Sequence, residues 1–180
     1  MQVCSIAHTR YPNVTDADAE KLAAVLDLTA DTGAADTEVL KGLYRRALDA
    51  VEKHTGRIMR SSGLRVELLA ESELALTLPV FPVASVDFVI VDGEATTDYF
   101  VSASAAGTRL TLPAPVSGNV VVDVTAGYAA PILPPPCFEA AVLALAADMY
   151  EHRESQSEVN LYENRQLKFV LADLKFYNCG

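Results

Sequence analysis

Residues 51–69, VEKHTGRIMRSSGLRVELL, decide the fold of this chain, because the spacing of apolar residues changes within them. Before Gly56 the apolar positions recur at helical spacing, which predicts a helix over 36–54. Gly56 then stands where the left-handed residue after a helix end belongs. Beyond it the spacing falls to two, the period of a strand with one buried face. This passage from helix into strand predicts an α+β fold.

The strand signal continues through a series of short segments rich in Val, Leu and Phe. Turn residues separate them, among them Asp92-Gly93, Gly107 and the run Pro113–Pro115. Strands this short and closely spaced predict an antiparallel β-subdomain over 57–128 rather than parallel strands joined by helices. The predicted strands are Leu64–Leu69, Leu74–Leu78, Ser85–Val91, Tyr99–Val101, Thr108–Leu112 and Asn119–Thr125.

A short helix is predicted upstream of this region. Thr15 followed by Asp18 is typical of a helix start with an acid in the first turn, and the helix should reach about Leu28. The loop Asp31-Thr32-Gly33 separates it from the helix over 36–54. We therefore expect residues 1–30 to form an N-terminal extension.

Downstream, four prolines ending at Pro136 lead into a strongly apolar helix. Its apolar residues extend around most of its circumference, so we expect burial on most sides, within the domain or against a partner. A polar break at 151–155 ends it, and another helix follows. The predicted organisation has three parts. Residues 1–30 form an N-terminal extension, and residues 31–155 form a helical bundle-like domain, with helices 36–54 and 136–153, interrupted by the β-subdomain. Residues 156–180 form a C-terminal helical arm, with a helix over 161–175.

Composition narrows the range of functions. The 180 residues are 51% hydrophobic and 21% charged, enough apolar material for a packed core. The net charge is −10, and residues 61–134 hold two arginines against eight acids. This acidity argues against tight binding to nucleic acid through its phosphates. No apolar run is long enough to span a bilayer, and Met1–Arg10 lacks the apolar region of a signal peptide, so we expect a soluble chain without a membrane partner.

No catalytic or cofactor motif is evident. The phosphate-binding glycine patterns and the nucleophile elbow are absent, and the three histidines and three cysteines lack metal-ligand spacing. Asp92-Gly93-Glu94 with Asp98 lacks the alternating acids of a calcium loop and is better interpreted as a hairpin turn. We expect no enzyme activity, no metal and no cofactor.

The C-terminal arm holds apolar residues on more than one helix face. Phe169 and Phe176 lie on a different stripe from the leucines, with Tyr177 beside them. Two interpretations remain open. The segment folds back as core, or part of it is a docking arm that a partner completes.

Taken in order, several of these segments resemble a known family. They run from the helix end Val51–Arg57, through Leu78-Pro-Val-Phe-Pro-Val-Ala-Ser-Val86 and Asp98–Val101, to Val120–Tyr128 and the helix closing at Glu154. This series resembles the head–tail connector, or adaptor, proteins of tailed bacteriophages and gene transfer agents. The resemblance covers roughly residues 36–155.

The resemblance implies a virion structural protein at the head–tail junction, assembled in the host cytoplasm. It implies a homo-oligomeric ring, usually of twelve copies, beneath the portal protein. Such a ring extends the channel through which DNA passes in packaging and ejection, and it provides the surface for a stopper or other neck or tail protein. An acidic chain agrees with DNA that slides through without tight binding.

Candidate contact residues follow from the resemblance together with the unplaced apolar residues. The C-terminal arm is the candidate portal-docking segment, through Leu167, Phe169, Val170, Leu174, Phe176 and Tyr177. Two turn regions are candidates for the tail side or for a neighbouring subunit: Asp92, Gly93, Glu94 and Thr96, and Ser104 and Gly107.

Two alternative functions stay open at this point. A tail-side completion or stopper protein would be mainly β, and the strong flanking helices speak against it. A small hydrolase using Asp98, Glu151 or His152 would need those groups to converge in a pocket with perturbed pKa values.

Overall fold

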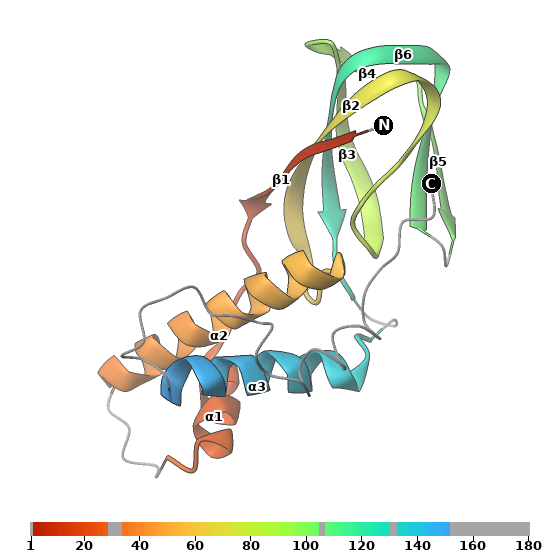
Figure 1. Cartoon of the computed structure of the whole chain (residues 1–180). Coiled ribbons are helices and arrows are strands. Elements are labelled where there is room, and N and C mark those ends of the chain that lie inside the picture. The colour runs from red at the N-terminus through yellow and green to blue at the C-terminus, as the bar shows by residue number, and fades with distance from the viewer. Residues whose placement is uncertain (1, 29–33, 105–106, 130–132, 152–180) are drawn as a thin grey trace. The chain divides into compact units, whose positions relative to one another are not determined.

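A computed structural model describes residues 2–28, 34–104, 107–129 and 133–151. The predicted loop at 31–33, the predicted helix over 161–175 and the six candidate portal-docking residues lie outside these ranges. The chain divides into two compact units (Figure 1). The β unit takes its described residues from 2–12 and 56–133, and the helical unit from 13–55 and 134–151. Helices together with an antiparallel sheet confirm the predicted α+β class.

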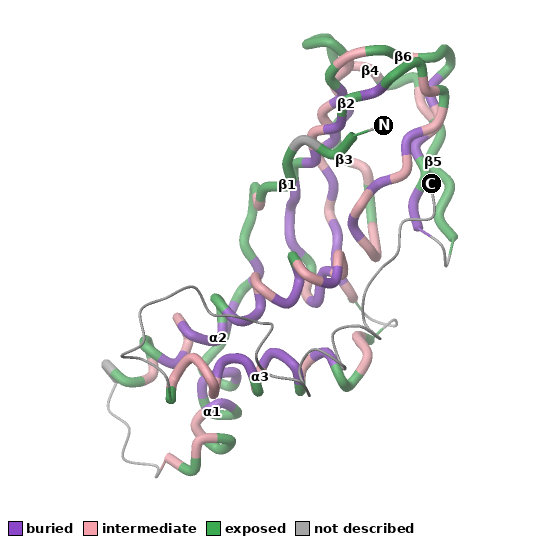
Figure 2. Tube along the Cα trace, in the orientation of Figure 1, coloured by how far each residue is buried: buried purple, intermediate pink, exposed green. Residues whose placement is uncertain are grey.

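The described part of the helical unit holds α1 (Asp16–Val25), α2 (Ala34–Thr55) and α3 (Pro136–Glu151), which pack on one another. Each turns one apolar face inward, as the buried stretches in Figure 2 show. The largest fully buried side chains are Tyr44 and Phe138, both 0% exposed. Around them lie further buried residues: Leu22, Leu40, Leu43, Ala47, Leu48, Val51, Ala141, Val142, Leu145 and Ala146.

The helix ends follow the predicted local chemistry. The Thr15 backbone N–H donates to Asp18 Oδ2 at 2.8 Å, and the Thr15 hydroxyl donates to the same oxygen at 3.0 Å. These bonds satisfy the backbone N–H of Thr15 just before α1 and confirm the predicted helix start. At the end of α2, Gly56 has a φ of 69°, the left-handed conformation predicted for it.

The prediction for α3 is confirmed only in part. Its buried residues lie on one face, whereas Ala140 and Ala144 on the other face are exposed. Among the described residues α1 and α2 cover a single face of α3. Burial of its other sides against a partner stays a prediction.

The described residues of the β unit form a six-stranded antiparallel sheet (Figure 1). Its main path runs β1-β2-β6-β3-β4, and β5 pairs with β6 off this path. The two central strands are long, and both arch over at one end of the unit. The strands are β1 (Gln2–Arg10), β2 (Ser62–Thr77), β3 (Val83–Val91), β4 (Glu94–Thr96), β5 (Phe100–Ser104) and β6 (Gly107–Ala126).

The two halves of β2 and β6 contribute to one apolar core. Leu76 and Leu110, from the halves next to β5, are buried with Val66 and Val122 from the halves next to β1 and β3. Alternate residues of each strand point inward, as period-two burial requires. The bend in the long strands therefore lets one pair of strands cover both sides of its own core.

The predicted division into short strands is wrong in two places. Leu64–Leu69 and Leu74–Leu78 belong to the single strand β2, except for Leu78, which follows it. Thr108–Leu112 and Asn119–Thr125 belong to the single strand β6. Register shifts absorb the residues that were interpreted as breaks: Glu73 pairs with Val116, and Ala75 with Thr111.

The N-terminal segment contains a strand that the sequence did not predict. The short helix is confirmed as α1, which ends at Val25 rather than near Leu28. Residues 2–10 ahead of it form β1, which pairs antiparallel with β2. β1 lacks strict apolar alternation, so its conformation is set by its hydrogen-bonded partner rather than by its own pattern.

Candidate functional site

The first candidate site is the hairpin between β3 and β4. Asp92 and Gly93 form its turn, with φ angles of 50° and 88°, and Val91 pairs with Glu94 across it. Positive φ at both central residues is the requirement of the tight turn that Asp-Gly favours. The predicted hairpin turn is therefore confirmed.

Hydrogen bonds fasten this turn to β6. The Asp92 backbone N–H donates to the Asn119 carbonyl at 2.9 Å, and the Asn119 backbone N–H donates to Asp92 Oδ1 at 3.1 Å. Gly118, with a φ of 132°, lets the Asp92 carboxylate approach. A Cβ at Gly118 would lie only 2.2 Å from Oδ1 of Asp92. Asp92-Gly93 and Ser117-Gly118, which the sequence presents as two separate turns, thus form one linked structure.

A hollow of about 550 Å³ lies beside this hairpin. Leu112 and Val116 of β6 contribute apolar wall, and Asp92 and Glu94 contribute carboxylates. It forms because residues 112–115 of β6 have no partner in β2, and the prolines there have no N–H to leave unsatisfied. The lining residues are Val91, Asp92, Glu94, Ala95, Thr96, Leu112, Pro113, Ala114 and Val116.

Four of the six predicted turn residues belong to this hairpin, and three of them line the hollow. Asp92, Glu94 and Thr96 line it, and Gly93 completes the turn. Ser104 and Gly107 lie elsewhere, at the turn between β5 and β6, where the Ser104 hydroxyl donates to the Gly107 carbonyl at 3.2 Å. The structure therefore does not bring the two predicted turn regions together. The contribution of Leu112–Val116 was missed, although the run Pro113–Pro115 marked it as a break.

Three segments that carry the family resemblance meet inside the β unit. Arg57 Nη1 donates to the Tyr128 hydroxyl at 2.7 Å, and the Arg57 guanidinium lies 5.3 Å from the centre of the Phe81 ring. Phe81 and Tyr128 contact edge to face, with ring centres 6.4 Å apart. The backbone of Ile58 also donates to the Phe81 carbonyl at 2.8 Å. These motif residues hold three distant segments together, so their role here is structural.

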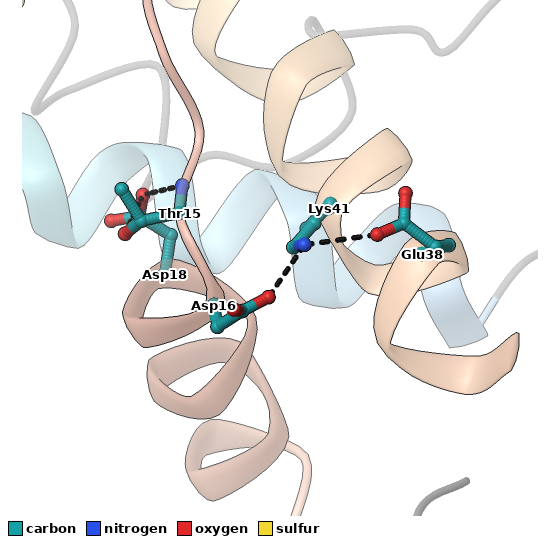
Figure 3. A network of polar contacts seen from close by, with 5 residues as sticks. All are labelled: Thr15, Asp16, Asp18, Glu38 and Lys41. Atoms are coloured by element: carbon teal, nitrogen blue, oxygen red, sulfur yellow. Dashed lines mark hydrogen bonds and ion pairs between the residues drawn. The ribbon is translucent and has the colours of Figure 1, made fainter. Parts of the chain in front are cut away.

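The described helices are connected by a polar network. Lys41 lies between two carboxylates, 2.5 Å from Asp16 and 2.9 Å from Glu38 (Figure 3). Hydrogen bonds from Lys41 to Asp16, and then to Glu38, raise the pKa of the ammonium above its ordinary value. Lys21 of α1 also pairs with Glu139 of α3 at 2.5 Å. These ion pairs connect α1 to both of its neighbouring helices.

The outer face of the sheet carries a second set of polar pairs. Arg65 contacts Asp123 through two parallel hydrogen bonds of 2.8 Å and 2.7 Å. The hydrogen bonds from the guanidinium lower the pKa of Asp123 below its ordinary value. Asp87 accepts hydrogen bonds from the hydroxyls of Ser85 and Thr125. The Arg65–Asp123 and Thr125–Asp87 contacts each join two neighbouring strands, which is the pattern of a solvated sheet face.

The residues of the hydrolase alternative are distributed over the chain. Asp98 follows β4 in the β unit, where its backbone N–H donates to the Thr96 hydroxyl at 3.2 Å. Glu151 is the last residue of α3, in the helical unit, and His152 lies outside the described residues. Within the described ranges, no group of three or more His, Cys, Asp or Glu side chains could hold a metal ion. None of the helices described is both long and apolar enough to cross a membrane.

Comparison with known proteins gives matches among solved structures. No family model and no curated protein matches the chain. A chain from the neck of an empty GTA particle, solved with C6 symmetry, covers 96% of each chain at 24% identity, with a TM-score of 0.71. A chain from the virion of a native gene transfer agent (GTA) particle covers 96% of this chain and 95% of that one, at 22% identity and a TM-score of 0.69.

A third match comes from the neck of a native GTA particle solved with C12 symmetry. It covers 98% of this chain and 96% of that one, at 22% identity and a TM-score of 0.65. Identities this low establish a shared fold rather than a shared role. The likeness nevertheless extends over nearly the whole length of both partners.

Proposed function

We propose that the chain is a virion structural protein of the neck that joins the head to the tail. One observation carries the proposal: the fold matches a chain from a particle neck over 96% of both lengths, with a TM-score of 0.71. The motif series that resembles head–tail connectors points to the same place in a particle, and it was identified from the sequence alone. The role is structural and not enzymatic.

Within the neck, the role that best fits the resemblance is that of an adaptor beneath the portal protein. In this role the chain forms a ring, with twelve copies as the expected number, and it extends the DNA channel. Each copy adds a formal charge of −10. A ring of such copies does not hold a duplex through its phosphates, so DNA can slide through it.

The β3–β4 hairpin and its hollow are the proposed surface for the stopper or another neck or tail protein. The hollow combines apolar wall from Leu112 and Val116 with carboxylates of Asp92 and Glu94. A partner segment with an apolar side chain beside a Lys or Arg has the complementary chemistry. The C-terminal arm, with Phe169, Phe176 and Tyr177 as anchors, remains the proposed portal-docking segment.

Deletion of the gene, followed by negative-stain imaging of the particles, tests the neck role. Heads lying beside separate, finished tails are the expected result. Intact, joined particles would refute the proposal and return attention to the hydrolase alternative.

A binding assay separates the adaptor from a tail-side neck protein. The purified full chain should bind purified portal rings without any tail component present. Binding to the tail-side neck protein combined with no binding to portal would assign the chain to the tail side instead.

A further inference from the structure

We propose that β1 of one copy adds to β5 of the next copy, so that neighbouring subunits pair head to tail through their sheets. The proposal deepens the ring role above and rests on it. It commits to a second copy of this chain as the occupant of two strand edges. Those two edges are described in turn.

β1 is a sheet edge with little of its own surface buried. Of the described strands it pairs only with β2, and each of its described side chains is at least partly exposed. Val3 is 40% exposed and Ile6 is 42% exposed, although their cross-strand neighbours Leu68 and Val66 are fully buried. β1 therefore continues the apolar inner face of the sheet beyond the region that the rest of the unit covers.

β5 has the same character on the other side of the long strand pair. It pairs only with β6 among the described strands, and each of its five residues is exposed. Val101 is 36% exposed opposite the fully buried Leu110, and Phe100 is 68% exposed. β1 borders β2 and β5 borders β6, so the two edges lie on opposite sides of the β2–β6 pair (Figure 1).

The lengths of the two edges agree. The register of β1 against β2 shifts near residues 4 and 9, which leaves the regular run Ser5–His8. β5 pairs with β6 without a shift over its five residues, Phe100–Ser104. Strand addition through main-chain hydrogen bonds needs two regular segments of comparable length.

Charge complementarity favours a second copy as the partner. β1 holds Arg10 and no acid, although the chain as a whole has a net charge of −10. The segment leading into β5 holds Glu94 and Asp98, and no Lys or Arg lies between residues 92 and 104. Pairing β1 with β5 brings the Arg10 charge to the strand whose preceding segment holds Glu94 and Asp98, whereas β1 paired with β1 meets no acidic group. Contact between two different surfaces is also the type that closes into a ring.

Cross-linking of the full chain tests the pairing. Two variants are prepared with Cys4, Cys137 and Cys179 changed to Ser, one carrying Ile6→Cys and the other a size tag and Val101→Cys. The variants are mixed at millimolar concentration and treated with a short bis-maleimide. We expect a cross-linked heterodimer in the mixture and its loss when either variant is treated alone.

A matched control uses another exposed apolar residue. Val25 is 53% exposed on α1, and a Val25→Cys chain mixed with the Ile6→Cys chain should give no heterodimer. Cross-linking of Ile6→Cys to itself would overturn the head-to-tail pairing, and so would a mixture without any cross-link. Either result combined with intact portal binding would leave the proposed function in place. Cross-linking without portal binding would instead refute the adaptor role and leave the pairing.

Discussion

Replacing Gly118 by Ala should damage the link between the candidate docking hairpin and β6. Gly118 has a φ of 132°, a conformation that side chains disfavour. The added Cβ would lie 2.2 Å from Oδ1 of Asp92, which accepts a hydrogen bond from the Asn119 backbone. The carboxylate can move away only by giving up that bond.

The expected loss of stability is the sum of these two costs. A non-glycine residue held in such a backbone region costs on the order of 1–3 kcal/mol. The lost hydrogen bond costs about 0.5–1.5 kcal/mol. Gly118→Ala should therefore lower the free energy of unfolding by about 1.5–4.5 kcal/mol, measured by urea denaturation of the purified chain.

A second substitution separates the two costs. Asp92→Gly removes the carboxylate and suits the positive φ of 50° at this turn position. In the double variant, Gly118→Ala should cost only the backbone part, about 1–3 kcal/mol. An equal cost of Gly118→Ala with and without Asp92 would refute the clash, and no cost in either background would refute the strained backbone.

The remaining predictions concern the helical unit, the sheet face and the arm. Gly42→Ala should raise the free energy of unfolding by about 0.5–1 kcal/mol, because Gly42 lies inside α2 with nothing within 4 Å of an added Cβ; a lower urea midpoint would contradict this. Phe138→Ala should lower the free energy of unfolding by about 3–5 kcal/mol, since the ring is 0% exposed. A thermal midpoint within error of wild type would contradict the burial of Phe138 in the helical core. Asp123→Asn should cause a small loss of stability at neutral pH. Because Arg65 lowers the pKa of the Asp123 carboxyl, this carboxylate stabilises the fold above the ordinary carboxyl pKa, and the stabilisation is lost as the pH falls below it. The urea midpoints of wild type and Asp123→Asn should therefore converge in acid. Truncation after Ser155 should leave a folded chain that no longer binds portal, measured by circular dichroism and pull-down, and unfolding would mean that the arm belongs to the core.

The candidate site was only partly predictable from the sequence. The pair Asp92-Gly93 predicted its turn, because a tight hairpin needs positive φ at two adjacent positions and few residue pairs tolerate it. The link from Asp92 to Gly118 and Asn119 was not visible, because the two turns are separated along the chain and meet only through strand pairing. The same holds for Arg57, Phe81 and Tyr128, which were recognised as motif pieces without any sign that they touch.

The sequence by itself determined the features that depend on neighbouring residues: the helix over 36–54, its glycine stop at Gly56, the start of α1 and the Asp-Gly hairpin. Their causes are helical periodicity, capping and backbone conformation, which act over a few residues. Only the tertiary structure decided that β1 is a strand and that β2 and β6 bend without breaking. Strand pairing satisfies backbone groups across long sequence separations, so a partner can recruit residues without a strand pattern and absorb prolines in a bulge.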